Sequence, residues 1–333
     1  MNTTNIANLW GIILAGGNGT RVREFLRQRC GGHGIKQFCA VVGRRSMLEH
    51  TLARTERLIP RERTLVVVSQ DHRLEATPQL AHWPTENVIW QPLNRDTAPG
   101  IFLPLAYISE RAPFATVAVF PSDHFILDEA RFMQSVGEAV EETRAFPREL
   151  TLLGMTPDTV EEGYGWIEPV AAEPGRATCA VRRFWEKPSR TDAGALLRRG
   201  ALWNTFVFVA KAATLWEMTR QTVPELYEDF TYLRRVLQQP HAAEVTARIY
   251  HTMRSVNFSS DICEALPSRL RVLRVPEVGW SDWGSEERIR SSLQQLGKSN
   301  TGSTHPRRYS TTGTLPAPFL LSPQKPATVS SSS

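Results

Sequence analysis

A glycine-rich turn directly after a short apolar run constrains this chain more than any other feature of its sequence. The apolar run covers residues 9–15 and leads into residues 16–21, Gly-Gly-Asn-Gly-Thr-Arg. Such a run is typical of a buried strand that enters a tight loop. Glycines leave no Cβ between the backbone amides and a bulky anion, so the loop predicts a triphosphate cradle, with Arg21 and Lys36 adding positive charge beside it. The plain alternative is an ordinary strand-to-helix turn.

Two better-known glycine loops do not fit this segment. A P-loop requires Gly-Lys-Ser/Thr after four intervening residues, and no such triplet follows Gly16. A dinucleotide-binding fingerprint requires a third glycine at position 22, which is Val22. The loop therefore indicates a different kind of nucleotide site.

Strand and helix patterns alternate over residues 9–155. A serine and a glutamate three residues apart, Ser46 and Glu49, form a capping box that predicts the start of a helix. The continuous apolar run 64–69 is typical of a strand buried on both faces. Further strands are predicted at 87–91, 116–120 and 150–155, and helices at 46–59, 71–81, 97–110 and 128–146. Asp128 is the expected N-cap of the last of these helices, and Thr97 is a candidate N-cap of the helix at 97–110. This alternation predicts an α/β fold with a doubly wound, mostly parallel, Rossmann-like open sheet.

The pattern changes after residue 155. Strands predicted at 163–168 and 179–186 have no helix between them, and a helix at 191–199, a strand at 203–209, several helices within 212–253 and a strand at 271–275 follow. Residues 298–333 are rich in Ser, Thr and Pro and predict a disordered tail. We therefore expect one catalytic domain over 1–297, with a first half at about 9–155 and an inserted sub-region at 156–288.

The charge distribution argues against a nucleic-acid-binding protein. The net charge is +5 and the pI is about 9.2. Five basic and no acidic residues lie between 290 and 333, so the tail carries the whole excess and the body is near neutral. A basic bias in the folded part, which nucleic-acid-binding domains usually have, is missing.

Cysteine usage and hydropathy favour a cytoplasmic protein. The four cysteines, Cys30, Cys39, Cys179 and Cys263, are scattered without metal-binding spacing, which favours reduced thiols. No apolar run is long enough to span a bilayer, so we expect no membrane partner. The first apolar stretch lacks a preceding basic segment, which predicts a strand rather than a secretion signal.

Two aspartates are candidate metal ligands. Asp123 follows the predicted strand 116–120, and ligands bind beyond the carboxyl ends of strands in open α/β sheets. Asp282 stands between two tryptophans in Trp280-Ser281-Asp282-Trp283. Mg²⁺ prefers one or two carboxylates together with phosphate oxygens. The plain alternative for each aspartate is a helix N-cap.

A family resemblance rests on the glycine loop and a second segment. Residues 14–21, Leu-Ala-Gly-Gly-Asn-Gly-Thr-Arg, with Lys36-Gln37-Phe38 resemble the signature of sugar-1-phosphate nucleotidyltransferases, and the Lys-Gln-Phe triplet resembles that of mannose-1-phosphate guanylyltransferases. The resemblance implies transfer of a nucleotidyl group from GTP to mannose 1-phosphate, giving GDP-mannose and diphosphate, with Mg²⁺ as cofactor. It allows for a homodimer. Ile35 replaces the usual proline before the lysine, and 22–34 is atypical.

The resemblance also implies roles for individual residues. It assigns catalysis to Arg21, Lys36 and Asp123, and the metal to Asp123 and Asp282. It assigns nucleotide binding to Leu14, Gly16, Gly17, Gly19, Thr20, Arg21, Gln91, Asn94 and Thr97. It assigns binding of the sugar phosphate to Gly165, Glu168, Glu186, Lys187 and Asn204. The pair Thr205-Phe206 replaces the usual Ser-Gly, and Trp283 replaces a valine, so the sugar is less well determined than the reaction.

Three alternatives remain beside this reading. The first is a nucleotidyltransferase for another sugar 1-phosphate or base. The second is a non-catalytic relative that binds a sugar nucleotide and regulates a partner. The third is a glycosyltransferase, which the sequence disfavours because no Asp-x-Asp pair surrounds Asp123.

Overall fold

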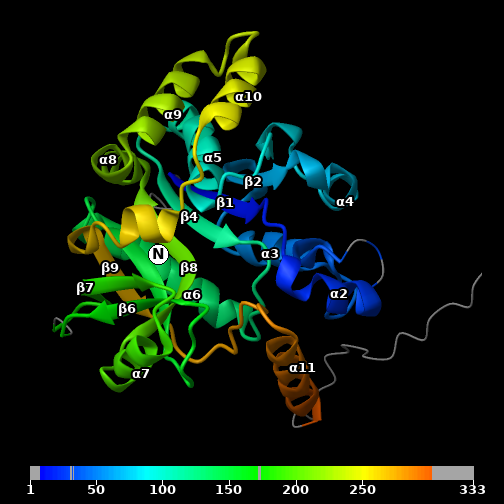
Figure 1. Ribbon diagram of the computed structural model, residues 1–333, viewed down its shortest axis with the longest axis vertical. Coiled ribbons are helices and arrows are strands. Elements are labelled where there is room, and N and C mark those ends of the chain that lie inside the picture. The colour runs from blue at the N-terminus through cyan, green and yellow to red at the C-terminus, as the bar shows by residue number, and fades with distance from the viewer. Residues whose placement is uncertain (1–7, 31, 33, 172–173, 302–333) are drawn as a thin grey trace, which may run out of the picture.

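The computed structural model describes residues 8–301, except 31, 33, 172 and 173. Within them, nine strands form one sheet in the order β3-β2-β1-β4-β8-β5-β9-β7-β6 (Figure 1). No helix among the described residues is long and apolar enough to cross a membrane.

The first half of the chain forms the parallel side of the sheet. Its strands are β1 (Leu9–Ala15), β2 (Thr64–Ser69), β3 (Val88–Gln91) and β4 (Thr116–Pro121), with β1 parallel to both β2 and β4. Every residue of β2 is buried, as its unbroken apolar run predicts for a strand covered on both faces. The helices of this half are α2 (Arg23–Cys30), α3 (Met47–Thr55), α4 (Arg73–Gln79), α5 (Thr97–Arg111) and α6 (Glu129–Ala145).

The second half makes the sheet mixed rather than mostly parallel. Its strands are β5 (Leu150–Met155), β6 (Gly165–Pro169), β7 (Thr178–Glu186), β8 (Leu202–Lys211) and β9 (Leu270–Arg274). Strand β8 lies between β4 and β5 and is antiparallel to both, whereas β5 and β9 are parallel. The parallel prediction therefore holds for the strands of 9–121 and fails where β8 separates two strands that follow each other in sequence.

The remaining helices are α7 (Arg190–Arg198), α8 (Ala212–Thr222), α9 (Pro224–Val236), α10 (Ala242–Thr252) and α11 (Glu286–Thr301). In Figure 1, α8, α9 and α10 lie with α5 in the upper part of the view, whereas α7 and α11 lie at its lower edge. Helix α11 continues to Thr301, so 298–301, which the composition placed in the tail, are helical. The rest of that predicted tail, 302–333, lies outside the described residues.

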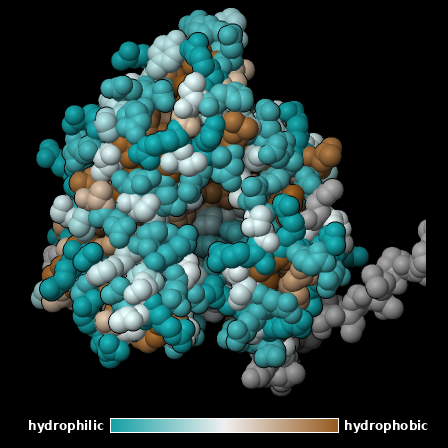
Figure 2. Space-filling view, viewed as in Figure 1, coloured by the Kyte–Doolittle hydropathy of each residue, from teal (hydrophilic) through white to brown (hydrophobic). Residues whose placement is uncertain are grey.

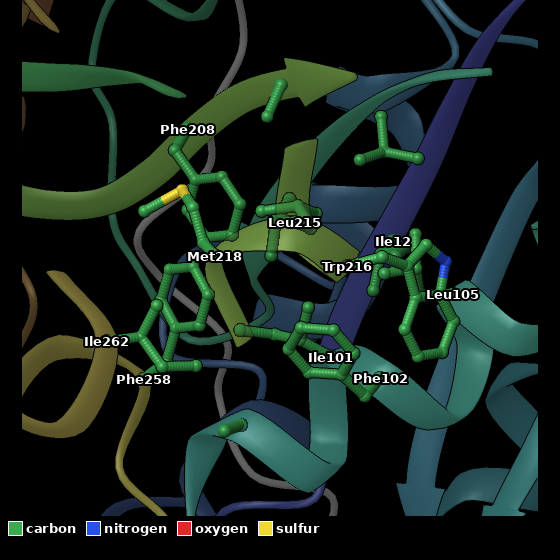
Figure 3. Packing of buried hydrophobic residues seen from close by; sticks show 14 of the residues in the cluster. Ile12, Ile101, Phe102, Leu105, Phe208, Leu215, Trp216, Met218, Phe258 and Ile262 are labelled. Carbon is green, nitrogen blue, oxygen red and sulfur yellow. The ribbon is translucent and has the colours of Figure 1, made fainter. Parts of the chain in front are cut away.

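Alternating side chains of the strands fill two large cores, one on each face of the sheet. On β1, Ile12 packs into the core under α5 and α8–α10, while Ile13 packs into the core under α3, α4 and α6. Figure 3 shows the first of these cores, where the rings of Phe208 and Phe258 stack near Ile262 with their centroids 4.8 Å apart. These cores fix the strand ends from which the functional loops start.

A third, smaller core lies beside the sheet, and we call it the satellite core. Its buried members are Val22, Leu26, Cys39, Val41, Met47, Phe125, Trp283 and Ile289. They come from the segments after the glycine loop, after Lys36, after Asp123 and after Asp282, and from α11. The satellite core therefore ties together segments that are far apart in the sequence.

Capping at the helix starts agrees with the sequence at two positions and differs at one. Ser46 and Glu49 make both bonds of the predicted capping box, and Asp128 accepts from the backbone N–H of Arg131 at the start of α6. At the start of α5 the cap is Asp96, whose carboxylate accepts from the N–H of Thr97. Thr97 is the first helical residue, so the expectation that it caps this helix was wrong.

Candidate active site

The glycine loop and the Lys36-Gln37-Phe38 turn form one unit. The side-chain amide of Gln37 donates to the carbonyls of Ala15 and Gly17, at 3.1 and 2.7 Å. Gly19 has the left-handed backbone, φ 54°, and a Cβ on it would lie 3.2 Å from the Cβ of Lys36. A glycine is therefore needed here for both the turn and the close approach of Lys36.

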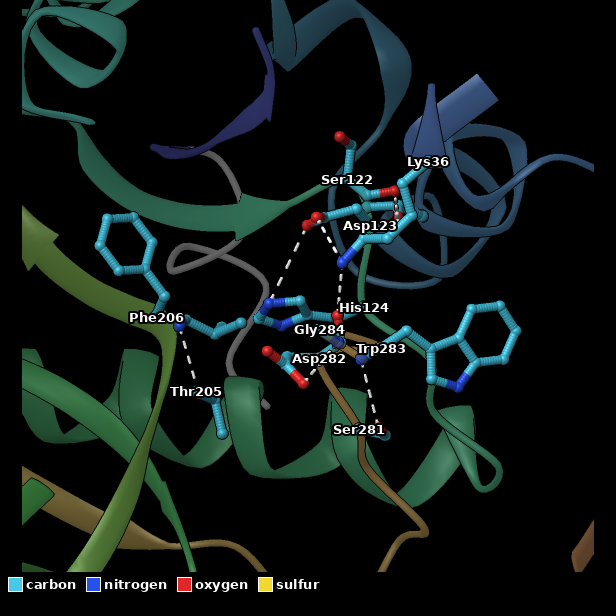
Figure 4. Close-up of polar contacts among 12 residues, drawn as sticks. Lys36, Ser122, Asp123, His124, Thr205, Phe206, Ser281, Asp282, Trp283 and Gly284 are labelled. Carbon is cyan, nitrogen blue, oxygen red and sulfur yellow. Dashed lines mark hydrogen bonds and ion pairs between the residues drawn. The ribbon is translucent and has the colours of Figure 1, made fainter. Parts of the chain in front are cut away.

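Lys36 connects the two candidate metal ligands. Its Nζ lies 2.7 Å from Oδ2 of Asp123 and donates to the backbone carbonyl of Asp282 at 2.5 Å (Figure 4). The Lys36 side chain is 6% exposed, whereas that of Asp123 is 32% exposed. The contact thus lies at the floor of a partly open site, and Figure 2 shows that this face of the molecule is hollowed near its centre.

Charge around the two aspartates keeps both ionised. Burial alone would raise the pKa of Asp123, but attraction to Lys36 and the hydrogen bond from it outweigh burial, so the pKa lies below its ordinary value. At Asp282 burial also acts to raise the pKa, and Arg288, Lys36 and the hydrogen bond from Tyr164 together lower it. Both carboxylates are therefore negative at neutral pH.

His124 is a neutral neighbour of Asp123. Burial is the main cause that lowers its pKa to about 4. Its Nδ1 accepts from the indole N–H of Trp280 at 3.3 Å, so Nε2 carries the proton and lies 3.9 Å from Oδ1 of Asp123. The ring supplies a dipole toward Asp123 rather than a full charge.

Leu14, Gly16 and Gln91, which the resemblance assigns to nucleotide binding, lie together at the end of β1. Asn94 and Thr97, which it assigns to the same role, make other contacts. Cβ atoms added to Gly16 and Gly100 would lie 3.7 and 3.4 Å from Oε1 of Gln91, and that on Gly100 would lie 4.0 Å from Leu14. Asn94 accepts from the N–H of Asp96, and the Thr97 hydroxyl accepts from the N–H of Phe258. Those two oxygens therefore serve the loop's own structure.

Four of the five residues expected at the sugar phosphate lie together. A Cβ on Gly165 would lie 3.1 Å from Oε2 of Glu186 and 3.2 Å from Cβ of Asn204. Lys187 Nζ lies 3.4 Å from Oε1 of Glu186. Glu168 differs: it is three residues from Gly165 on β6, so it faces the other side, and its carboxylate pairs with Arg199 at 3.4 Å. The structure does not bring Glu168 to this group.

Residues 163–164 lie next to three segments of the predicted site. The Cβ position of Gly163 lies 3.7 Å from Nη1 of Arg21, which is exposed. The Tyr164 carbonyl accepts from the N–H of Lys187 at 3.2 Å, and its hydroxyl donates to Asp282 at 2.7 Å. The backbone carbonyl of Asp282 accepts from Lys36, which pairs with Asp123, so charged residues from both halves of the chain meet here.

Family comparison agrees with this geometry. The family model described as nucleotidyl transferase matches residues 10–298. The chain belongs to the nucleotidyl transferase family. A putative mannose-1-phosphate guanylyltransferase of Vibrio cholerae is 27% identical over 278 residues, covering 82% of this chain and 58% of the relative. A mannose-1-phosphate guanylyltransferase of Escherichia coli is 30% identical over 222 residues, covering 65% of this chain and 46% of the relative.

A solved structure supports the fold of this nucleotidyl transferase. The crystal structure of a Thermus thermophilus protein, described as mannose-1-phosphate geranyltransferase, has a TM-score of 0.74 and 27% identity, covering 86% of this chain and 80% of that one. The chain spans about half the length of the curated relatives it matches. The family and the fold are thereby established for the region 10–298.

Several side chains of this nucleotidyl transferase site were not predicted. Tyr164 lies between two glycines of a segment that the sequence already singled out, and its own role could have been suspected there. Arg288 and Glu161 carry no signal, since each looks like an ordinary charged residue next to a helix or strand. Their contacts with Asp282 and with each other become visible only in the folded chain.

The donor set of this site fits a divalent cation such as Mg²⁺. Asp123 and Asp282 are both ionised and both contact Lys36, and oxygen ligands of this kind suit Mg²⁺. A Cβ on Gly284 would lie 2.5 Å from Oδ2 of Asp282, so only glycine lets the carboxylate take this position. Among the described residues, the hydrogen bonds to the Asp282 carboxylate all reach Oδ1.

Proposed function

We propose that this nucleotidyl transferase joins GTP and mannose 1-phosphate to form GDP-mannose and diphosphate. The single observation that carries the proposal is the position of Lys36 between Asp123 and Asp282. That arrangement combines a cation for a triphosphate with two carboxylates for a divalent metal. Similarity to relatives described as mannose-1-phosphate guanylyltransferases supports the choice of substrates.

In this proposal the residues position the reactants and neutralise charge. The sugar phosphate is itself the nucleophile, so the site needs no serine, cysteine or general base. Arg21, Lys36 and the loop amides hold the triphosphate and stabilise the leaving diphosphate, while Lys187 directs the sugar phosphate toward the α-phosphate. A Mg²⁺ ion held by Asp123 and Asp282 would supply further neutralisation of phosphate charge.

A second sugar is kept as a candidate because of Phe206. This residue has φ 58°, and its N–H donates to Oδ1 of Asn204, which lies beside Gly165. A phenyl ring therefore lies two residues after Asn204, the residue proposed to read the sugar. This favours testing other sugar 1-phosphates beside mannose 1-phosphate.

The test is a diphosphate-release assay with GTP and mannose 1-phosphate, with and without Mg²⁺. We expect release that requires both substrates and the metal, and a lower initial rate with ATP, UTP or dTTP. Tight binding of GDP-mannose without any release would instead indicate a non-catalytic regulatory protein. A higher rate with another sugar 1-phosphate or base would keep the reaction and change the substrate.

The setting of this activity is also a proposal. GTP and sugar phosphates are used in the cytoplasm, and we infer that the enzyme works there. A homodimer remains a prediction that sedimentation of the full chain would test.

A further inference from the structure

The carboxylate of Asp282 is held from one side. Its Oδ1 accepts three hydrogen bonds, from the Tyr164 hydroxyl at 2.7 Å, the Gly284 N–H at 2.9 Å and Nη1 of Arg288 at 2.7 Å. A carboxylate oxygen with this many donors is fixed in orientation, and bonds to a charged donor are the strongest among them. The other oxygen, Oδ2, accepts none of these three bonds, and it packs against Gly284, where a Cβ would lie only 2.5 Å from it.

Arg288 is the central member of this group. Its Nη2 pairs with Oε2 of Glu161, its Nη1 pairs with Asp282, and its guanidinium lies 4.3 Å from the centroid of the Tyr164 ring. The side chains of all three charged residues are less than a quarter exposed. Such a shielded, forked contact depends on arginine, because lysine offers a single point charge instead of a planar fork.

The helix that carries Arg288 is itself anchored. The next residue, Ile289, is fully buried in the satellite core, where Trp283 stacks on Phe125 at 5.0 Å. Trp283 directly follows Asp282, and Phe125 follows Asp123 by two residues. Glu161 and Tyr164, by contrast, lie in the segment that leads into β6. Arg288 therefore links that segment to the core that fixes both aspartates.

We propose that Arg288 is a positioning residue for the metal site. It holds Oδ1 of Asp282 toward the protein, so that Oδ2 is presented to the divalent cation, and it keeps Asp282 in register with residues 161–164. The proposal rests on the proposed function, since it assumes that Asp282 binds the metal. The opposite role is also testable: an arginine that competed with the cation would weaken its binding.

The experiment measures binding of Mn²⁺, as a spectroscopic substitute for Mg²⁺, by electron paramagnetic resonance of the free ion. Titrations use the full chain without nucleotide and again with a fixed concentration of GDP-mannose. We expect Arg288→Met to raise the dissociation constant for Mn²⁺ by about 10-fold or more, the usual effect of losing a partner of a metal ligand. Arg288→Lys should restore part of this loss, and Tyr164→Phe should cause a smaller loss.

Arg290→Met is the matched control on the same helix. Arg290 pairs with Glu286 within α11 and is exposed, so its loss should leave Mn²⁺ binding unchanged. In turnover assays, Arg288→Met should raise the Mg²⁺ concentration needed for half-maximal rate more than it lowers the rate at saturating Mg²⁺. A merely structural role would lower the melting temperature without this shift.

Three results would overturn the inference. Wild-type affinity for Mn²⁺ in a folded Arg288→Met protein would remove the positioning role, and tighter binding would replace it with competition. No Mn²⁺ binding by the wild type would remove the metal site as well. Failure of the proposed function is separate, because it is read from diphosphate release by the wild type alone.

Discussion

The nucleotide side and the sugar side of the site differ in the residue types that occupy their left-handed backbone positions. On the nucleotide side, the left-handed position next to Lys36 is occupied by a glycine, Gly19. On the sugar and metal side, three left-handed positions carry full side chains: Lys187, Phe206 and Trp283. For an L-residue this conformation costs about 1–2 kcal/mol, so the second side retains strain that the glycine loop avoids, although Asp96 on the nucleotide side also has a positive φ, 71°.

Packing explains why the two strained aromatic positions keep their side chains. Trp283 is fully buried and stacks on Phe125, and Phe206 lies 6.3 Å from the ring of Phe258 and 6.4 Å from that of Phe208. Burying a large apolar side chain stabilises by about 1.5–3 kcal/mol, which offsets the backbone cost. Glycine thus serves where an anion must approach the backbone, and aromatic residues serve where a loop must be anchored.

The largest expected effect is on turnover and follows from removing the carboxylate of Asp123, which both sides share. Asp123→Ala removes a charge from a partly enclosed site, where such a contact contributes about 3 kcal/mol to the barrier, so we expect at least a ~100-fold loss of turnover. Circular dichroism should show that the fold survives. Asp128→Ala is the control, because Asp128 caps α6 and should affect stability only. Full activity in a folded Asp123→Ala protein would remove Asp123 from the site.

The second prediction tests whether the nucleotide side needs a glycine at position 19. Gly19→Ala should lower the free energy of unfolding by about 1–2 kcal/mol because of its left-handed backbone, and it should also displace Lys36. Gly200→Ala is the matched control: φ is 75° there, but no atom lies within 4 Å of the new Cβ. Chemical denaturation should give similar losses for both variants, whereas diphosphate release should fall only for Gly19→Ala. Equal rates in the two variants would contradict the role of the close approach.

The third prediction tests the aromatic ring and the left-handed backbone of Phe206 on the sugar side. Phe206→Gly and Phe206→Ala both lose the ring, but only glycine relieves the backbone at φ 58°. The glycine variant should therefore be more stable than the alanine variant by about 1 kcal/mol. Denaturant midpoints give this difference, and initial rates across several sugar 1-phosphates show whether the ring limits the choice of sugar. Identical midpoints would mean that the backbone relaxes after truncation.

The smallest expected effect is on the pH dependence of the free energy of unfolding, which should have opposite signs for Glu186 and Asp282. Burial raises the pKa of Glu186, so its stabilising contribution is present at acid pH and is lost as pH rises through the folded-state pKa. Glu186→Gln should therefore gain stability relative to the wild type between pH 4 and pH 7. Asp282→Asn should lose stability relative to the wild type at lower pH, as pH rises from about 2 to about 5, because the pKa of Asp282 is lowered and its contribution appears over that interval. Unfolding free energies measured at the ends of each interval check the two signs, and trends in the same direction would refute the contrast.

Local patterns in the sequence predicted much of the first half and part of the site. The buried strand β2, the capping box at Ser46 and the cap at Asp128 follow from neighbouring residues alone, and the structure has all three. The glycine loop and Lys36 were assigned to one site before any contact was known. The place of β8 between β4 and β5 was not predicted. Strand order depends on tertiary packing between segments that are distant in the sequence, and local patterns do not reveal that packing.

Within the site, the sequence by itself determined the types of charge: two aspartates, a lysine after a glycine loop, and a second lysine after a strand. Only the tertiary structure decided that Glu168 turns away to Arg199 and that Arg288 joins Asp282 to Glu161. The physical reason is that a charged side chain acts through whichever partner comes within a few ångströms of it. Two partners of Asp282 are far away in the sequence, Tyr164 by 118 residues and Lys36 by 246, and at such a separation spacing along the chain carries no information.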